Sequence, residues 1–191
     1  VDYLGVFDAN LFALKTDPYV SRSIFYNVYK GEHGLVGETE IVYSYPKEGP
    51  AWKTKGYRTW TQVYVPKGSI LTGASGQMRD EGSRERGGVA ISQELEKTVF
   101  GAFLAVQAGE VKRLKFVYRL PDYIEEAVND GAYDLYVQKQ AGTLGHGLTV
   151  TADFGKVPKL WSPRGLRVSR NESRLTWQTN LQQDQEFKIE W

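Results

Sequence analysis

The chain contains no cysteine and only two histidines, His33 and His146. The lack of cysteine excludes a disulfide framework, a thiolate zinc site and a cysteine nucleophile. Each histidine stands beside glycine in a predicted turn, and neither has a carboxylate at a metal-ligand spacing. We therefore expect two solvated loop histidines. The sequence predicts no catalytic residues, no metal site and no bound cofactor.

The chain also lacks a long apolar run and an excess of charge of either sign. No stretch approaches the roughly 18 apolar residues that a membrane-spanning helix needs, so we expect no membrane insertion by this segment. The 191 residues include 24 basic and 23 acidic ones, for a net charge of +1. Proteins that bind nucleic acid through its phosphates usually carry a basic excess, so nucleic acid is not an expected partner.

What the chain does have is an alternation of apolar and polar residues along most of its length. Residues 148–154 (LTVTADF) and 187–191 (FKIEW) are clear examples. Side chains of a strand point to opposite faces with period two, so each run is one strand with a dry and a wet face. The sequence predicts an all-β fold, an antiparallel β-sandwich of immunoglobulin-like style with at most one or two short helices. We expect one domain over residues 1–191, with a possible subdivision near 156–165.

Local signals refine this expectation at the start and in the middle of the chain. A short first strand is predicted over residues 3–7, followed by irregular chain over residues 8–18 with the Asp17-Pro18 turn. Residues 98–106 are apolar on both faces, which predicts a strand buried near the centre of a sheet. Residues 114–120 alternate, and a tight turn joins the two segments. Two strands joined by such a turn are predicted to form a long hairpin.

Residues 122–131 are the best helix candidate. Asp122 stands at the capping position, Glu125 follows at the capping-box spacing, and Gly131 could end the helix. At this length the helix would have one or two turns.

Four aromatic residues form a candidate ligand surface: Trp52, Trp60, Tyr64 and Trp161. Trp60 and Tyr64 share one predicted strand face with polar residues, a mixed surface of the kind that glycans bind. The alternative is that the tryptophan rings pack at an edge of the core, where this residue type is usually largely buried.

Lys139 is a candidate for an intramolecular cross-link. It shares a predicted strand face with Leu135 and Val137, so its side chain would point inward at the end of the strand. Some surface adhesins join such a lysine to an asparagine, and Asn10 and Asn27 are the candidate partners. The alternatives are a lysine that snorkels to the rim or a buried ammonium paired with a carboxylate. An intact mass lower by one ammonia would establish the cross-link.

Several short segments together carry a resemblance to a known family. They are residues 6–10 (VFDAN), 15–20 (KTDPYV), 64–69 (YVPKGS), 97–103 (KTVFGAF), 108–110 (AGE), 118–121 (YRLP) and 136–143 (YVQKQAGT). In this order they resemble the C-terminal part of a bacterial family called domain of unknown function 4012. The resemblance spans nearly the whole chain.

The resemblance implies a long protein with an N-terminal membrane anchor, with this segment at the C-terminal end of a region outside the cytoplasm. The start at Val1 rather than at methionine also favours a fragment of a longer chain. The family is uncharacterised, so the resemblance implies no activity and no catalytic residues. Related proteins often have Gly-Lys-Thr where this chain has Glu96-Lys97-Thr98, and glycine is the residue best suited to a positive-φ turn.

Two functions remain open from the sequence. The first is a non-enzymatic module of a membrane-anchored bacterial envelope protein, with a structural, adhesion or interaction role toward an envelope protein or polysaccharide. The second is a carbohydrate-binding or carbohydrate-processing domain of the cell surface. Glycoside hydrolysis needs two carboxylates, and Glu125, Glu126 and Asp153 are the candidates. A third possibility is that the module only packs against the rest of its own chain.

Overall fold

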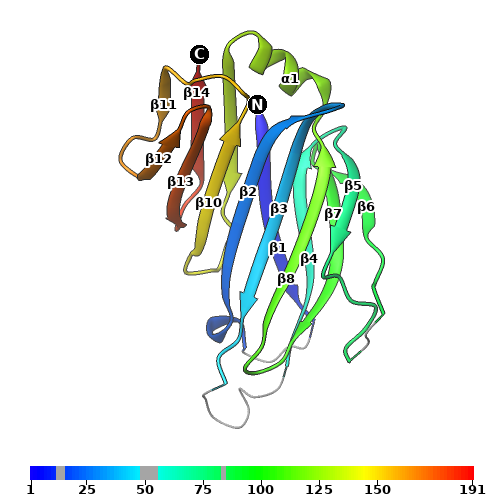
Figure 1. The fold of residues 1–191 in the computed structure, drawn as a ribbon. Coiled ribbons are helices and arrows are strands. Elements are labelled where there is room, and N and C mark those ends of the chain that lie inside the picture. Colours follow the sequence, from blue (N-terminus) through cyan, green and yellow to red (C-terminus); the bar gives the residue numbers. More distant parts are fainter. Residues whose placement is uncertain (12–15, 48–55, 83–84) are drawn as a thin grey trace.

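A computed structural model describes residues 1–11, 16–47, 56–82 and 85–191 of the chain. Strands dominate these residues and form two sheets that pack face to face (Figure 1). The described residues add one short α-helix, α1 (Asp122–Asn129), and a 3-10 turn, η1 (Asp17–Tyr19). The predicted all-β sandwich with at most one or two short helices is confirmed.

The first sheet, sheet A, has the strand order β11-β14-β9-β1-β4-β7-β6. Its strands are β1 (Asp2–Asn10), β4 (Tyr57–Pro66), β6 (Ala90–Glu94), β7 (Lys97–Val106), β9 (Ala132–Gln138), β11 (Leu160–Ser162) and β14 (Gln185–Glu190). Strand β1 therefore lies at the centre of the sheet, although it comes first in the chain.

The second sheet, sheet B, has the strand order β12-β13-β10-β2-β3-β8-β5. Its strands are β2 (Ser21–Gly31), β3 (Gly34–Ser44), β5 (Ile70–Ser75), β8 (Val111–Arg119), β10 (His146–Asp153), β12 (Arg167–Asn171) and β13 (Arg174–Leu181). Strand β2 takes the same central place here that β1 takes in sheet A.

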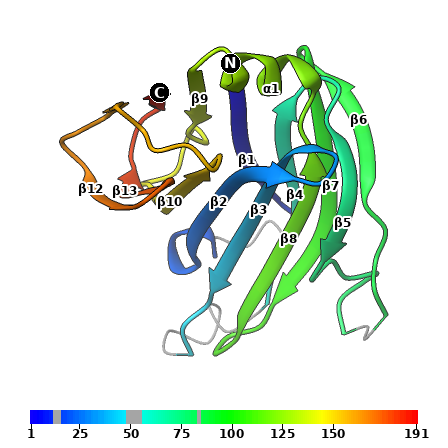
Figure 2. The same cartoon turned by 45° about the horizontal axis from the view of Figure 1, so that its top comes forward.

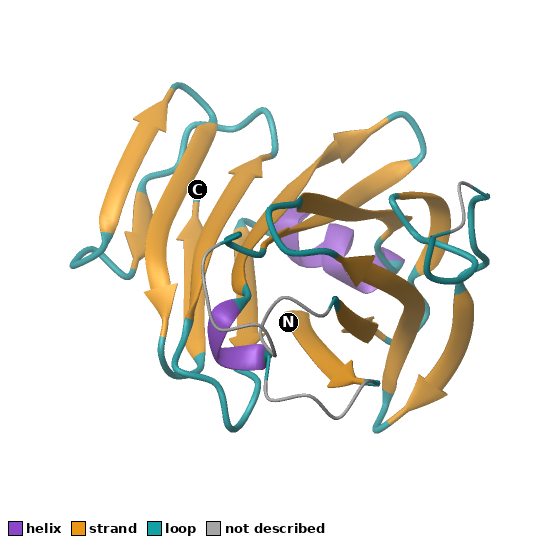
Figure 3. Cartoon of the chain, turned by 90° about the horizontal axis from the view of Figure 1, so that it is seen from below, coloured by secondary structure: helices purple, strands orange, loops and turns teal. Residues whose placement is uncertain are grey.

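The strands before α1 and the strands after it meet at one parallel pair in each sheet. These pairs are β1 with β9 and β2 with β10, and every other named pair is antiparallel among the described residues. We call the β2–β10 pair the seam of sheet B. Parallel neighbours need a long crossover between them, and here most of the chain separates them. The strands after α1 consequently gather on one side of the molecule (Figure 2). Figure 3 shows the C-terminus on one side of the molecule.

The core lies between the two sheets and takes side chains from both halves. Phe116 and Tyr118 on β8 are fully buried, as are Trp177 on β13 and Phe187 on β14. Among the described residues they belong to one connected cluster of buried side chains. Residues on both sides of the 156–165 segment therefore share this core.

Strand β1 is longer than the sequence analysis predicts. It starts at Asp2 and continues through Asn10, so Asp8 belongs to a strand and not to irregular chain. By the two-residue period the inward face of β1 carries Asp2, Leu4, Val6 and Asp8. An aspartate thus stands at each end of an otherwise apolar strand face, and both accept hydrogen bonds from other strands.

The predicted hairpin between residues 98–106 and 114–120 is wrong. Strand β7 pairs with β4 and β6 in sheet A, whereas β8 pairs with β3 and β5 in sheet B. The tight turn is present, and Gly109 in it has φ 85°, but it carries the chain from one sheet to the other. Both strands find partners on each side within their own sheets, which leaves no edge for them to share.

Helix α1 forms where predicted, but Asp122 does not cap it. Asp122 is its first helical residue, Pro121 occupies the N-cap position, and no side chain makes a capping hydrogen bond there. Proline has no N–H group and a fixed φ, and here it has extended backbone at φ −67°, which suits the entry to a helix. The helix ends before Gly131, whose φ of 103° is of the kind that glycine adopts freely.

The turn between β6 and β7 has a positive φ without any glycine. Leu95 and Glu96 have φ values of 49° and 56°. Two successive residues of this kind make the two-residue turn that fits the right-handed twist of a hairpin. Glu96 therefore adopts the conformation for which glycine is best suited, and its carboxylate pairs with the Lys67 ammonium at 2.7 Å.

Candidate functional site

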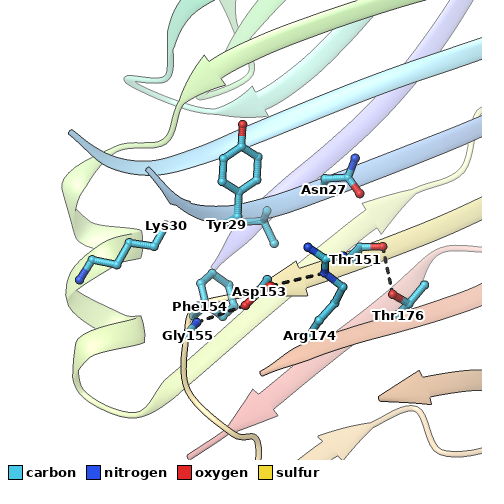
Figure 4. A pocket seen from close by; sticks show the side chains of 10 residues that line it. Asn27, Tyr29, Lys30, Thr151, Asp153, Phe154, Gly155, Arg174 and Thr176 are labelled. Atoms are coloured by element: carbon cyan, nitrogen blue, oxygen red, sulfur yellow. Dashed lines mark hydrogen bonds and ion pairs between the residues drawn. The ribbon is translucent and has the colours of Figure 1, made fainter. Parts of the chain in front are cut away.

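An open groove of about 800 Å³ lies over the seam of sheet B (Figure 4). Its lining comes from three strands and the residues that follow β10: Asn27, Val28, Tyr29, Lys30, Thr151, Asp153, Phe154, Gly155, Arg174 and Thr176. We call it the seam groove. The lining mixes charged, amide, hydroxyl and aromatic side chains, so it can offer both hydrogen bonds and a ring face to a ligand.

The polar side chains of the groove point outward because their neighbours point inward. On β2, Ile24, Tyr26 and Val28 are buried between the sheets, so Asn27 and Tyr29 take the outer face. The same period buries the apolar residues of β10 and turns Thr151 and Asp153 outward. The groove is therefore the wet face of a sheet whose dry face forms the core.

Asp153 is held in place by three neighbours. The hydroxyl of Ser173 donates to Asp153 Oδ1 at 2.8 Å, and the N–H of Gly155 donates to the same oxygen at 3.3 Å. The Arg174 Nε lies 3.4 Å from Asp153 Oδ2. Because most of the Arg174 side chain is exposed, its remaining N–H groups can reach a ligand in the groove.

Other polar groups of the seam groove are paired in the same way. The hydroxyls of Thr151 and Thr176 lie 3.2 Å apart, and the Asn27 amide donates to Glu38 at 3.3 Å. Glu38 in turn pairs with the Lys115 ammonium at 2.8 Å. These contacts fix the directions of the side chains before any ligand arrives, which lowers the entropy lost on binding.

Tyr29 supplies the exposed aromatic ring of the groove. Its exposed fraction is 37%, whereas Phe154 beside it is 5% exposed. In Figure 4 the Tyr29 ring projects from β2 away from the side chains of Asp153 and Arg174, so it stands at the rim of the groove. An aromatic ring next to planar amide and carboxylate groups suits the apolar face and the hydroxyl rim of a sugar.

The lining of the seam groove contains one carboxylate, that of Asp153. Glu125 and Glu126 lie on α1 and are not part of the lining. The three carboxylates named as candidates for glycoside hydrolysis are therefore not gathered in this groove.

Trp60 and Tyr64 lie on the outer face of sheet A, on the opposite side of the sandwich. Both rings are partly buried. Tyr64 packs edge-on against Phe7 with ring centroids 5.3 Å apart, and its hydroxyl donates to Glu94 at 3.0 Å. Trp60 covers Gly101, where an added Cβ would lie 2.8 Å from the ring. The two residues thus share a face of mixed polar and aromatic character, as the strand period predicts.

Trp161 is not part of that face. It pairs with Ile189 across the β11–β14 ladder, and Ile189 is buried between the sheets. Paired residues point to the same side, so Trp161 lies on the inner side of sheet A at its edge, and the structure does not bring it together with Trp60. Trp52 lies outside the described residues.

Lys139 follows β9 and binds the loop after it. Its ammonium donates to the Gln140 carbonyl at 3.0 Å and to the Thr143 carbonyl at 2.6 Å. Asn27 is on the outer face of sheet B, and the Asn10 amide donates to the Thr16 hydroxyl at 3.5 Å. These contacts fit the alternative in which the Lys139 side chain reaches the rim of the sandwich. The cross-link stays a prediction.

A buried polar network that the sequence analysis missed centres on Asp8. Tyr43 and Thr61 donate to Asp8 Oδ1 at 2.7 and 2.9 Å, and Arg22 Nη1 lies 2.7 Å from Oδ2. The Arg22 side chain is only 3% exposed. The signal was present, because Arg22 interrupts the apolar face formed by Val20, Ile24, Tyr26 and Val28, and a charge at a core position needs a partner.

His146 joins this network and is not the solvated loop histidine that we expected. It is the first residue of β10, half-buried, and its Nε2 contacts Arg22 Nη2. Burial, together with the nearby Arg22 charge, lowers the pKa of His146 to about 4. The imidazole is therefore neutral near neutral pH and accepts from the guanidinium. His33 lies in the exposed β2–β3 turn, as predicted.

Asp2 forms a second buried polar group at the other end of β1. Tyr133 donates to Asp2 Oδ2 at 2.6 Å, Tyr26 donates to the same oxygen, and the N–H of Tyr3 donates to Oδ1 at 2.7 Å. Burial raises the pKa of Asp2 to about 6, against the lowering effect of these hydrogen bonds. Both polar groups lie between the sheets and do not line the seam groove.

No group of three or more histidine, cysteine, aspartate or glutamate side chains that could hold a metal ion occurs in the described residues. Within the same residues, no helix has the length and apolar character required to cross a membrane. The sequence matches no family model and no curated protein.

Solved structures share the fold, and one of them does so at very low sequence identity. It is a protein of Legionella pneumophila described as a "putative nutrient binding protein", with a TM-score of 0.53 and 7% identity. The alignment covers 98% of this chain and 70% of that chain. At this identity the likeness shows the fold alone, so the present chain is similar in its arrangement of strands to that protein.

Proposed function

We propose that this chain is a non-enzymatic binding module of a bacterial envelope protein and that its seam groove holds a polysaccharide. The observation that supports this most directly is the groove itself: an open channel of mixed polar and apolar lining, with one exposed aromatic ring and side chains already fixed by hydrogen bonds. Small apolar ligands favour enclosed, mainly apolar cavities. An open groove that offers both hydrogen-bonding groups and a ring face suits a segment of a glycan chain.

The location of the module is part of the same proposal. The resemblance to the C-terminal part of domain of unknown function 4012 supports a place outside the cytoplasm, on a protein anchored in the membrane by an upstream segment. The L. pneumophila protein of similar fold is named for nutrient binding, which is compatible with a binding role for a sandwich of this arrangement. An envelope protein is the alternative partner for the same module.

The groove is tested by titration with oligosaccharides of bacterial cell walls, followed by calorimetry. The wild-type chain is compared with Tyr29→Ala, which removes the exposed ring of the groove. Loss of a ring contact of about 1 kcal/mol should raise the dissociation constant about fivefold. Asn27→Ala, which removes an amide of the lining, should weaken binding in the same direction.

Tyr123→Ala is the matched control, because Tyr123 is also exposed but lies on α1, outside the groove. It should bind as the wild-type chain does. Equal affinity of the wild-type chain and Tyr29→Ala for every oligosaccharide that binds would rule out the groove as the site.

A further inference from the structure

The charge of this chain is unevenly distributed. Residues 156–174 contain six basic residues and one acidic residue, Glu172. The remaining residues contain 18 basic and 22 acidic ones, so they carry a net negative charge. A local basic excess of this size creates a positive potential that attracts anions, even though the whole chain is close to neutral.

The fold places this basic segment at one end of the sandwich. Strands β11 and β12 are the edge strands of sheets A and B on the same side of the molecule (Figure 1). Arg164 lies between the two strands, and Arg167 and Arg170 lie on β12. All three side chains are exposed. We call this end, with Trp161, the arginine edge.

Two of the arginines are held by Trp161. The guanidinium carbons of Arg164 and Arg170 lie 5.4 and 5.7 Å from the centroid of the Trp161 ring. Such contacts hold a guanidinium in place while its N–H groups remain free to donate. Because guanidinium groups already contact the indole, we assign Trp161 a positioning role and not that of a platform for a sugar ring.

The described residues leave most of the arginines at this edge without an ion pair. Among the described residues, no carboxylate lies within ion-pair distance of Arg164, Arg167 or Arg170, whereas Arg174 pairs with Asp153. A pocket of about 260 Å³ lies beside Trp161 and Arg164 and includes the Lys188 ammonium and one carboxylate, that of Glu190. The planar fork of arginine binds carboxylate and phosphate oxygens in pairs.

We propose that the arginine edge binds an acidic polysaccharide, that is, a glycan chain carrying carboxylate or phosphate groups. This inference rests on the proposed function in taking a polysaccharide as the partner, and it names the chemical class of that ligand. Arg164 and Arg170 take the anionic groups, and Arg167 with Arg174 extends the basic surface onto the outer face of β12 and β13. Arg174 also lines the seam groove, so one glycan chain can follow both surfaces.

The position of the charges favours a polymer chain over a membrane or a nucleic acid. On an edge strand, residues of odd and even number point to opposite faces, so Arg167 and Arg170 cannot both face one flat lipid surface. A flexible chain can pass around the edge and reach both. A long nucleic acid would also run along the rest of the molecule, whose net charge is negative and repels it.

The test measures binding of the whole chain to polygalacturonate and to neutral dextran of similar length. The double variant Arg164→Ala/Arg170→Ala should bind polygalacturonate at least about tenfold more weakly than the wild-type chain, since charge-assisted hydrogen bonds are lost. Its binding to neutral glycans should not change. The difference should shrink between about 50 and about 200 mM salt, because salt screens exposed charges.

The matched control is Arg79→Ala/Arg113→Ala, which removes two exposed arginines from other parts of the surface and causes the same change in net charge. It should retain at least half of the wild-type affinity. Trp161→Leu should weaken binding of polygalacturonate without any loss of basic residues, which tests the positioning role. A glycerol-phosphate polymer in place of polygalacturonate distinguishes a phosphate-bearing ligand from a carboxylate-bearing one.

Three results would overturn the inference: equal binding of acidic glycan by the wild-type chain and the arginine double variant, equal loss in the control variant, or binding only to anionic vesicles or DNA. The groove is judged separately. In one outcome, Tyr29→Ala loses binding of neutral glycan and the arginine double variant binds as the wild-type chain does. The proposed function then stands and this inference fails. In the other outcome, only the arginine double variant loses binding of acidic glycan and Tyr29→Ala is unaffected. The groove is then excluded as the binding site and the arginine edge is supported.

Discussion

At the scale of single residues, the two aspartates of β1 differ in how their buried carboxyl groups are stabilised. Asp8 is paired with the Arg22 guanidinium, so its charge is matched within the core. Asp2 accepts hydrogen bonds from two tyrosine hydroxyls and one N–H group, and it makes no ion pair with a side chain among the described residues. Burial without an ion pair favours the protonated form of a carboxyl group, and the stability of the fold should therefore depend on pH through Asp2.

We predict that the free energy of unfolding of the wild-type chain falls as pH rises because Asp2 ionises, and that Asp2→Asn does not show this fall. The pKa of Asp2 is raised by burial from 3.8 to about 6. A group whose pKa is higher in the folded chain than in the unfolded chain stabilises the fold. This stabilisation is complete below the pKa of the unfolded chain, and it is lost as pH rises through the pKa of the folded chain. A shift of about two units corresponds to at most about 3 kcal/mol. The free energy of unfolding of the wild-type chain, relative to Asp2→Asn, should fall by up to that amount between about pH 4 and about pH 7.

Urea titrations of both proteins across this pH range give the measurement. The difference between the two proteins is used because His146 has a lowered pKa, so its contribution has the opposite sign and is lost as pH falls. Asp122→Asn, at an exposed position on α1, is the control and should show no such slope. A constant difference between wild type and Asp2→Asn would mean that Asp2 does not titrate in this range.

At the scale of elements, the alternation of residues predicted most strands but not their partners. Residues 98–106 and 114–120 were placed in one hairpin because the turn between them is short. The structure places them in different sheets. Alternation determines which face of a strand is dry. Two strands can both have a dry face whether they pair within one sheet or lie in opposite sheets, so alternation does not distinguish the two arrangements. The choice of partner depends on strands far away in the sequence.

The candidate site was less accessible to sequence analysis than the fold. Tyr29 lies far along the chain from Asp153, and the parallel seam pairs the two residues. The antiparallel β10–β13 pair then sets Arg174 opposite Asp153. Trp60 and Trp161 looked alike as exposed aromatics, yet they lie on opposite sides of sheet A. Arg22 and Asp8 could have been found, because each breaks an apolar strand face.

A second prediction concerns the β6–β7 turn. Leu95 has φ 49° and is 87% exposed, so it makes little contact that could offset its backbone conformation. Asparagine adopts this conformation at lower cost than a branched residue. Leu95→Asn should therefore raise the free energy of unfolding by about 0.5–1 kcal/mol, measured by thermal and urea denaturation.

Leu144→Asn is the control for this turn. Leu144 is 93% exposed and does not have a positive φ, so the same change of side chain should have no effect on stability there. An equal gain in both variants would point to the removal of an exposed leucine as the cause and not to the backbone of the turn.

At the scale of the whole molecule, the two halves on either side of α1 share one set of sheets and one core. The shared core extends across the 156–165 segment where the sequence allowed a subdivision. Small domains with one core usually unfold in one step. We therefore expect the halves to unfold together.

This expectation is tested with one core deletion in each half. Leu114 on β8 and Leu175 on β13 are both fully buried. Leu114→Ala and Leu175→Ala should each lower the free energy of unfolding by about 2–5 kcal/mol. In both variants, circular dichroism and tryptophan fluorescence should report one coincident transition at a lower midpoint.

Leu160→Ala, at an exposed position of the edge strand β11, should change stability by less than about 0.5 kcal/mol. Two separate transitions in Leu175→Ala, with the first half still folded after the second has melted, would show that the halves are independent domains.

The central positions of β1 and β2 have a consequence for the newly made chain. Each of these strands has one neighbour that is synthesised soon after it and one that is synthesised much later. The late neighbours are β9 for β1 and β10 for β2. While the ribosome is still adding the residues after α1, both sheets have one free hydrogen-bonding edge in what will become their interior. Such edges recruit strands from other molecules. In the period between synthesis of β8 and of β10, these interior edges are therefore open to pairing with strands of other chains.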